Sequence, residues 1–214
     1  FQGKNPDVPN ADRTFLGNGT LLRADAGTAG EGGRVIVWAD TLTKAHGAVS
    51  ARGGTQSGNG GFVEISGKQQ LVFDGAVNLS ATVGLAGTLL LDPDNIDVAI
   101  GGASVIGDVN LFAVNPGQSL TISPATLDAV GGNVMLQATN DIGFIDPVNL
   151  STAGATLTAL AGGVITVGAS ITTNGGAITL YANAPGSGGP GSNGSAVYVF
   201  APITSNGGNI TLRS

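Results

Sequence analysis

The chain has 214 residues, among them 37 glycines and no cysteine, and only 10% of its residues are charged. An ordinary soluble domain carries about 25% charged residues, and the missing cysteines exclude disulfides and thiolate metal sites. No Lys or Arg lies between Lys68 and Arg213, so this part of the chain lacks the cations that nucleic-acid binding requires.

Residues 1–13 are predicted to lie outside the folded core. Phe1-Gln2-Gly3 looks like the remnant of an engineered protease site, and residues 4–12 are rich in Pro, Asn and Asp, which is typical of a poorly ordered lead-in. The sequence has no signal peptide and stops just after a predicted strand. We therefore interpret residues 1–13 as tag remnant and lead-in, and the chain as a fragment of a longer repeat protein.

Residues 14–100 are predicted to form a first block of stacked β-strands. Gly32-Gly33 and Gly60-Gly61 each precede an apolar run with a spacing of 28 in the numbering, and Gly87 opens a third run at a similar interval. Glycine lets the chain turn a corner without strain. The spacing predicts that each run lies beside its copy in the next repeat.

The run after Gly61 has the alternation of a half-buried strand. Phe62 and Glu64 share one face, while Val63 and Ile65 share the other. Trp38, in the equivalent run before it, is expected to be at least partly buried, because an exposed Trp on a charge-poor surface would favour association.

Within residues 32–98, four stretches carry a family resemblance: residues 38–40 (WAD), 50–54 (SARGG), 60–68 (GGFVEISGK) and 89–93 (LLLDP). Through them the block resembles the region after the secretion domain in large filamentous-haemagglutinin-type adhesins of two-partner secretion. The resemblance implies a right-handed parallel β-helix, export through a dedicated outer-membrane transporter and a role in surface attachment. The Asn-Pro-Asn-type motifs of the secretion domain are missing, so this chain is not expected to be the part that the transporter recognises.

Asp92, Asp94 and Asp97 place three carboxylates within six residues. They are weak candidate ligands for Ca²⁺, and they could also act as acid and base in a polysaccharide-active enzyme. Asp-Pro-Asp-Asn is also favourable for a type I turn. We favour the turn, followed by a strand in which Ile96 and Ile100 face inward and Asp97 faces out. No metal and no cofactor are therefore expected.

Residues 101–131 depart from this pattern and are predicted to be an irregular junction. Ser123 stands in an N-cap position, Pro124 in the first helical position and Gly131 at the stop. We expect a short helix near residues 124–130 that interrupts the stack of strands.

Residues 132–214 form the second predicted block and contain the clearest repeat. The segment 169–180 (ASITTNGGAITL) recurs at 201–212 (APITSNGGNITL) with nine of twelve positions identical. Residues 185–194 (PGSGGPGSNG) are a predicted loop between the copies, and removing it leaves a period of 22. The same period leads back to Gly154 and Gly132, although the apolar residues near Gly154 slip by one position.

A period near 22, built from short β-type runs and Asn-Gly turns, is typical of a β-solenoid. A β-sandwich would give no reason for a constant spacing. The predicted fold class is therefore all-β, a parallel β-helix with a repeat period of about 22 to 28. Ile178 should lie beside Ile210, and Leu180 beside Leu212, in one parallel sheet.

Few residues suggest chemistry. His46, the only histidine, has no Ser or Cys partner nearby in sequence and is expected at a solvent-facing strand or corner, so no catalytic residue is predicted. Five Asn-x-Ser/Thr sequons are candidate glycosylation sites: Asn18, Asn78, Asn149, Asn193 and Asn209. Chance alone gives about two to three such sites in this composition, so composition explains them as readily as modification does.

We favour a non-catalytic function. The chain is interpreted as a segment of a large secreted adhesin on the bacterial cell surface, serving as a stalk and as a binding surface for host cell, glycan or biofilm matrix. The expected partners are the outer-membrane transporter of the full-length protein and a glycan or surface receptor, but no nucleic acid. The chain itself would be monomeric or weakly associated end to end.

The alternative is a polysaccharide-active enzyme on a β-helix scaffold. Such an enzyme needs a cation to stabilise developing negative charge. Before the terminus, the C-terminal half offers none, so an active site would have to lie near Arg34, Lys44, Arg52 and Lys68.

Overall fold

The computed structural model describes residues 7–101, 120–186 and 194–214 of the chain. The fold is nearly all-β, with 47% strand and 3% helix, and its sheets are parallel. The all-β prediction is thus confirmed. The only helix within the described residues has five residues, and no helix there is long and apolar enough to cross a membrane.

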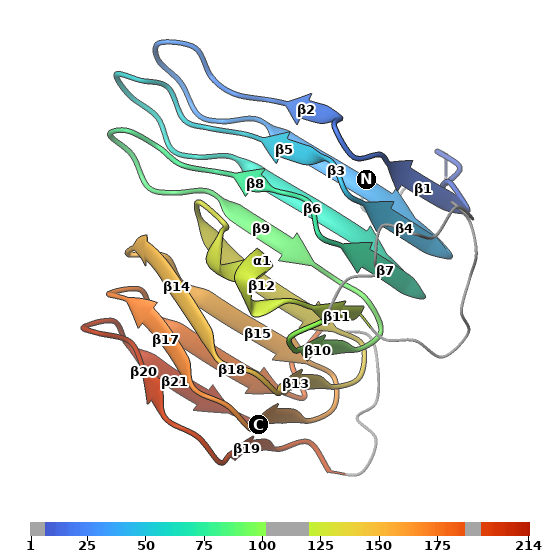
Figure 1. Ribbon diagram of the computed structural model, residues 1–214, viewed down its shortest axis with the longest axis vertical. Coiled ribbons are helices and arrows are strands. Elements are labelled where there is room, and N and C mark those ends of the chain that lie inside the picture. The colour runs from blue at the N-terminus through green and yellow to red at the C-terminus, as the bar shows by residue number, and fades with distance from the viewer. Residues whose placement is uncertain (1–6, 102–119, 187–193) are drawn as a thin grey trace.

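One seven-stranded parallel sheet runs along the long axis of the molecule, from blue to red in Figure 1. Its strands lie side by side in chain order: β3 (Arg34–Ala39), β6 (Phe62–Gly67), β9 (Thr88–Leu91), β12 (Asn133–Ala138), β15 (Leu157–Ala161), β18 (Ile178–Ala182) and β21 (Ile210–Arg213). Between one of these strands and the next, the chain passes through two further sheets, except between β9 and β12, where β10 and β11 belong to one sheet. We call each such passage, ending in a strand of the seven-stranded sheet, a rung.

The first three rungs share two three-stranded sheets. They are β1 (Arg13–Leu16), β4 (Leu42–Ala45) and β7 (Gln70–Phe73), and β2 (Leu21–Arg23), β5 (Ala48–Ser50) and β8 (Val77–Asn78). All of these strands pair in parallel with the equivalent strand of the next rung.

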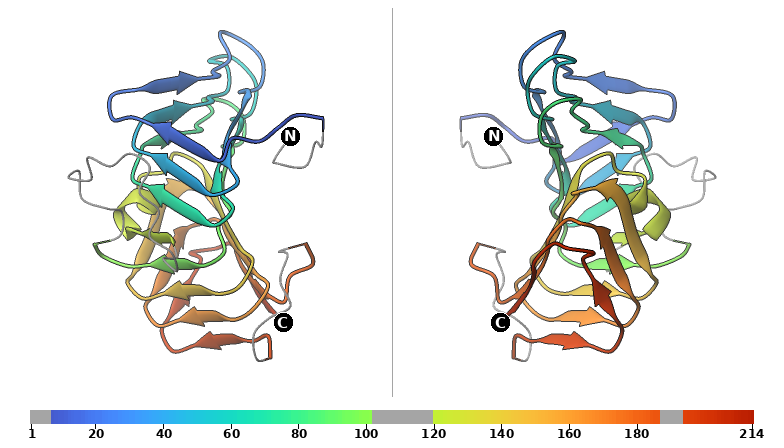
Figure 2. Two further views of the ribbon diagram at one scale, coloured as in Figure 1. Left: turned by 90° about the vertical axis from the view of Figure 1, so that its right-hand side faces the viewer. Right: turned by 90° about the vertical axis from the view of Figure 1, so that its left-hand side faces the viewer.

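The later rungs use two other sheets. One contains β11 (Leu120–Ile122), β10 (Ile96–Val98), β13 (Ile142–Phe144), β16 (Ile165–Val167) and β19 (Val197–Val199), and the other contains β14 (Val148–Ala153), β17 (Ile171–Asn174) and β20 (Ile203–Thr204). Figure 2 shows these rungs lying one below another from two sides.

The repeats of the sequence set the register. Ile178 pairs with Ile210 and Leu180 with Leu212, as the duplicated segment predicts. In the N-terminal part, Val35 pairs with Val63, its equivalent in the next repeat. A repeat in the sequence therefore corresponds to one rung, because equivalent residues become neighbours in the sheet.

The slip near Gly154 has a local cause. Leu157 pairs with both Val134 and Ile178, so it occupies the position of the apolar residue in this rung. The pairing of β14 with β17 shifts after Leu150, and Gly154 then adopts a φ of +72°. The irregular end of β14 absorbs the additional residue, and the next strand returns to register.

The fourth rung is irregular. The predicted short helix is α1 (Pro124–Asp128), preceded by Ser123 in extended conformation without a side-chain capping bond. The helix stands where other rungs have a strand: Gly131 forms an isolated parallel bridge with Asn78, and Asp128 accepts a hydrogen bond from the backbone of Asn149 at 2.8 Å. Residues 102–119 of the predicted junction lie outside the described residues, as do residues 187–193 of the predicted loop.

The core fills the space between the sheets with aliphatic side chains and two large buried rings, Phe73 and Phe144. Every second residue of a strand enters it, as in β18, where Ile178 and Leu180 are fully buried while Thr179 and Tyr181 are half-buried. Trp38 is half-buried, as expected.

Two expectations about single residues are wrong. Ile100 is 77% exposed, because β10 ends at Val98 and the backbone N–H of Ile100 then donates to Asp146 at 2.7 Å. Glu64, on the face of β6 opposite to the core, is only 1% exposed and accepts a hydrogen bond from Ser66. Alternation correctly separates the two faces of β6, but it does not reveal that both are covered.

Candidate functional site

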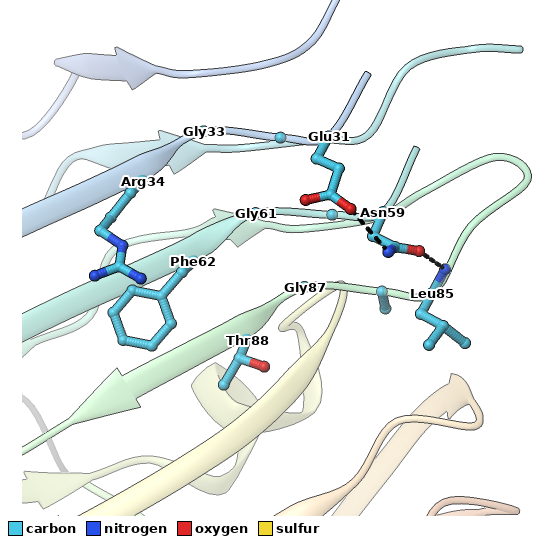
Figure 3. A pocket seen from close by; sticks show the side chains of 12 residues that line it. Glu31, Gly33, Arg34, Asn59, Gly61, Phe62, Leu85, Gly87 and Thr88 are labelled. Carbon is cyan, nitrogen blue, oxygen red and sulfur yellow. Dashed lines mark hydrogen bonds between the residues drawn. The ribbon is translucent and has the colours of Figure 1, made fainter. Parts of the chain in front are cut away.

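A groove lies where the first three strands of the seven-stranded sheet, β3, β6 and β9, begin (Figure 3). Its volume is about 430 Å³, within the roughly 300–1,000 Å³ of small-molecule sites. Its lining consists of three equivalent corner segments: Glu31, Gly32, Gly33 and Arg34; Asn59, Gly60, Gly61 and Phe62; and Leu85, Ala86, Gly87 and Thr88.

Close stacking of the backbone accounts for the glycines of the groove. A Cβ atom at Gly60 would lie 1.9 Å from the carbonyl oxygen of Leu79, and one at Gly61 would lie 2.0 Å from that of Gly33. Real Cβ atoms do not approach carbonyl oxygens so closely, so a side chain would force the rungs apart. The backbone of these glycines, together with Ala86, forms the floor between the two walls of the groove.

The wall on the strand side carries Arg34, Phe62 and Thr88, one from each rung. The guanidinium of Arg34 lies over the ring of Phe62, with its central carbon 5.0 Å from the ring centroid. A cation held against an aromatic face is stabilised by the ring quadrupole. The pair forms because Arg34 and Phe62 are directly opposite each other in β3 and β6.

The wall on the loop side carries Glu31, Asn59 and Leu85. The Asn59 amide donates to Oε1 of Glu31 at 3.2 Å, and its carbonyl oxygen accepts from the backbone N–H of Leu85 at 2.8 Å (Figure 3). Asn59 therefore links three successive rungs. Leu85 is 76% exposed, which places an apolar side chain beside the polar ones at the lower end of the groove.

A second groove of about 400 Å³ lies over β13 and contains Asp97 and Asp141. Burial raises the pKa of Asp97, and the negative charge of Asp141 raises it further. Asp141 accepts a hydrogen bond from the backbone N–H of Val164 at 2.7 Å, which fixes its carboxylate at the corner of the next rung. None of the residues that line this groove is Lys or Arg.

The three candidate ligands do not come together with other acidic or histidine side chains as a metal site. Within the described residues, no group of three or more His, Cys, Asp or Glu side chains is close enough to hold an ion. Asp92 and Asp94 lie at the corner between β9 and β10, and Asp97 lies in β10. The carbonyl oxygen of Asp94 accepts a hydrogen bond from Asn140 at 2.8 Å, so this corner stacks on the equivalent corner of the next rung.

Four of the five sequon asparagines lie among the described residues, and their side chains are exposed. They are Asn18, Asn78, Asn149 and Asn209. Asn193 lies outside the described residues. Asn78 accepts hydrogen bonds from the backbone and hydroxyl of Ser80 at 3.1 and 2.8 Å, so its side chain is already engaged in a local turn.

His46 is not solvent-facing, contrary to the expectation. Its side chain is 18% exposed, its Nδ1 atom lies 2.5 Å from Oδ1 of Asp74, and its ring packs against Phe15 at 5.9 Å. Sequence inspection missed Asp74 because this partner is far from His46 along the chain. The repeat spacing could have revealed this partner. Asp74 follows His46 by the length of one rung, which is also the separation of Val35 and Val63.

Comparison with known proteins does not assign the chain to a family. No protein-family model matches the chain, and no curated protein matches it.

Proposed function

We propose that the chain is a right-handed parallel β-helix and a non-catalytic segment of a large secreted bacterial adhesin. One observation carries the proposal: seven consecutive rungs contribute neighbouring parallel strands to one sheet. A rod of stacked rungs can be extended by adding further rungs at its ends, because each rung contacts mainly its neighbours. This property suits a stalk that holds a binding surface away from a cell.

Three of the four stretches that resemble the adhesin family occupy equivalent places in the seven-stranded sheet, whereas residues 50–54 begin at the end of β5. Residues 38–40 fall at the end of β3, residues 60–68 cover β6, and residues 89–93 cover the end of β9 and the corner after it. They recur at the spacing of the rungs, as expected if they are requirements of stacking in a β-helix. The partners of the full-length protein would then be an outer-membrane transporter and a glycan or other surface receptor.

The charge distribution favours such a receptor over nucleic acid. Among the described residues, every Lys and Arg except Arg213 lies in the first three rungs or beside them, and Arg52 is bound to Asp25. Binding to a phosphate backbone needs several free cations. Grooves with an aromatic ring and a few polar groups are better suited to a small, partly apolar ligand.

Labelling of intact cells tests the proposal. Antibodies raised against the purified chain should bind the surface of unpermeabilised cells that produce the parent protein, and deletion of the cognate outer-membrane transporter should remove the signal. Labelling that appears only after permeabilisation would contradict surface display. A crystal structure of the chain would test the handedness directly.

The second candidate, a polysaccharide-active enzyme, is favoured by Asp97 and Asp141. A carboxyl group with a raised pKa beside a second carboxylate is the arrangement that glycosidases use as acid and base. The corresponding groove, however, has no Lys or Arg in its lining. Release of reducing ends from acidic and neutral polysaccharides, lost in Asp97→Asn, would favour the enzyme.

A further inference from the structure

We propose that the groove of the first three rungs binds an acidic sugar, with Arg34 holding its carboxylate. The inference rests on the proposed role in surface attachment, and it assigns that role a site and a ligand class.

Arg34 is the cation that this groove presents to a ligand. Within the described residues, the other arginines of the first rungs, Arg13, Arg23 and Arg52, each have an Asp oxygen within 3.5 Å, whereas Arg34 has only the ring of Phe62. Its side chain is exposed, on the strand-side wall. The guanidinium therefore keeps its hydrogen-bond donors available on the side of the groove.

The geometry of Arg34 favours a carboxylate. A guanidinium offers two parallel N–H groups that match the two oxygens of a carboxylate, and such charge-assisted pairs are stronger than neutral hydrogen bonds. The Phe62 ring restricts the orientation of the guanidinium before the ligand arrives, which reduces the entropy lost on binding. Phe62 itself is half-buried at the edge of β6 and is held in place by the sheet.

The opposite wall favours hydroxyl groups. Oε1 of Glu31 accepts from Asn59, and no hydrogen bond among the described residues engages the other oxygen of this exposed carboxylate. A carboxylate accepts hydrogen bonds from hydroxyls but repels a second anion. A ligand with one anionic group near Arg34 and hydroxyls towards Glu31 fits both walls, and a uronic acid has this combination.

The floor and the lower end complete the fit. The three rungs span about 10 Å from the first to the third at the usual strand spacing, which is the scale of a disaccharide. Because the floor is glycine backbone apart from Ala86, one face of a sugar ring can approach it closely. The exposed Leu85 and the methyl group of Thr88 offer apolar contact for the C–H groups of the ring.

The test uses the purified chain and three four-sugar probes: oligogalacturonate, its neutral counterpart oligogalactose, and a sulfated oligogalactose. Calorimetry measures affinity, and the Nε–Hε NMR signal of Arg34 reports the site. We expect oligogalacturonate to bind and to shift this signal, with little effect from the neutral probe. Arg34→Gln should lower the affinity by about tenfold or more, and Arg34→Lys should lower it too, because the two parallel donors are lost.

Arg213 provides the matched control. It also lies over an aromatic ring, with its guanidinium carbon 4.7 Å from the Tyr181 centroid, but it is at the other end of the sheet and outside the groove. Arg213→Gln should leave the affinity unchanged. Equal losses from both variants would overturn the site, because attraction to any exposed cation would then explain the binding.

Three further results would overturn the inference: no binding of oligogalacturonate, equal binding of the neutral probe, or binding of the sulfated probe in its place. Cell labelling separates this outcome from that of the proposed function. A surface-displayed parent protein with an inactive Arg34 groove contradicts only the ligand site. Binding of acidic sugar by a protein that never reaches the surface contradicts only the adhesin.

Discussion

Asp25 and Arg52, one rung apart, form an ion pair with several hydrogen bonds to the carboxylate. The guanidinium of Arg52 donates to Oδ2 of Asp25 from two nitrogens at 3.1 and 2.9 Å, and Ser50 donates to Oδ1 at 2.5 Å. Burial of the carboxylate raises its pKa, but the hydrogen bonds from the Arg52 backbone, Ser50 and the guanidinium lower it more, to about 2.

This pair predicts a specific pH dependence. Because the pKa of Asp25 is lower in the folded than in the unfolded chain, its contribution to stability is present above about pH 4 and is lost as the pH falls from about 4 to 2. Asp25→Asn should lower the free energy of unfolding by about 2 kcal/mol at pH 7 and reduce its dependence on pH in that window. Urea unfolding at several pH values measures both.

The control for this experiment is Asp12→Asn. Asp12 also contacts an arginine, Arg13, but the carboxylate is 68% exposed, and exposed pairs contribute little. If both variants gave the same small effect, burial and the additional hydrogen bonds would not distinguish the Asp25 pair.

Stacking predicts that a defect in the core spreads locally. Ile178 is fully buried between Leu157 and Ile210, so Ile178→Asp should bury a carboxylate at a cost of several kcal/mol. Hydrogen exchange should show lost protection after about Gly163, while the strand around Val63 stays protected. Thr179→Asp, on the outer face of the same strand, should have little effect. Loss of protection across the whole chain in Ile178→Asp would indicate one cooperative unit.

The glycines of the groove are predicted to be intolerant of side chains. Gly60→Ala would place a Cβ atom 1.9 Å from the Leu79 carbonyl oxygen, so we expect a loss of about 2 kcal/mol or more in the free energy of unfolding. Gly27→Ala should be nearly neutral, because a Cβ atom there meets nothing within 4 Å and its φ is not positive. Thermal unfolding of the two variants compares them. Equal melting temperatures would show that the rungs can separate enough to admit a methyl group.

The last rung is predicted to associate with other molecules. Its core-facing residues remain open, with Ile210 45% and Leu212 47% exposed, and β21 is an edge strand. Unpaired edges with apolar side chains favour strand addition. Sedimentation should therefore show weak, concentration-dependent dimers, and Ile210→Lys should shift the equilibrium towards monomer. A strictly monomeric wild-type chain at high concentration would contradict this prediction.

The repeats made much of the fold predictable. Equivalent apolar residues at constant spacing specify which side chains become neighbours, and the Ile178–Ile210 pair follows directly from the duplicated segment. The start of α1 at Ser123 and Pro124 could be predicted for a different reason, because helix ends depend on the residues at the ends themselves. The start of α1 depends on a short stretch of sequence, and the strand pairing depends on the similarity of two copies of one stretch.

The contacts of the candidate site were harder to predict. Arg34 and Phe62, like His46 and Asp74, are neighbours only because the two members of each pair are one rung apart along the chain. Such pairs can be found once the length of one rung is known. The proximity of Asp141 to Asp97 follows no comparable rule, because their separation includes the irregular fourth rung.

The order of β10 and β11 could not be read from the sequence at all. The later strand, β11, lies on the side of β10 away from β13, so chain order and spatial order differ at this point. Local patterns determine that each segment is a strand. They do not determine on which side of its neighbour it is placed.

This inversion has a consequence for how such a protein can be enlarged. β10 and β11 are adjacent and parallel in one sheet. The seven-stranded sheet continues past this point without interruption, as β9 pairs directly with β12. Extra sequence between the two strands therefore need not change the register of the seven-stranded sheet. A position between β10 and β11 is therefore suited to grafting an epitope or a whole domain, because β10 pairs with β11 and β9 pairs with β12 directly.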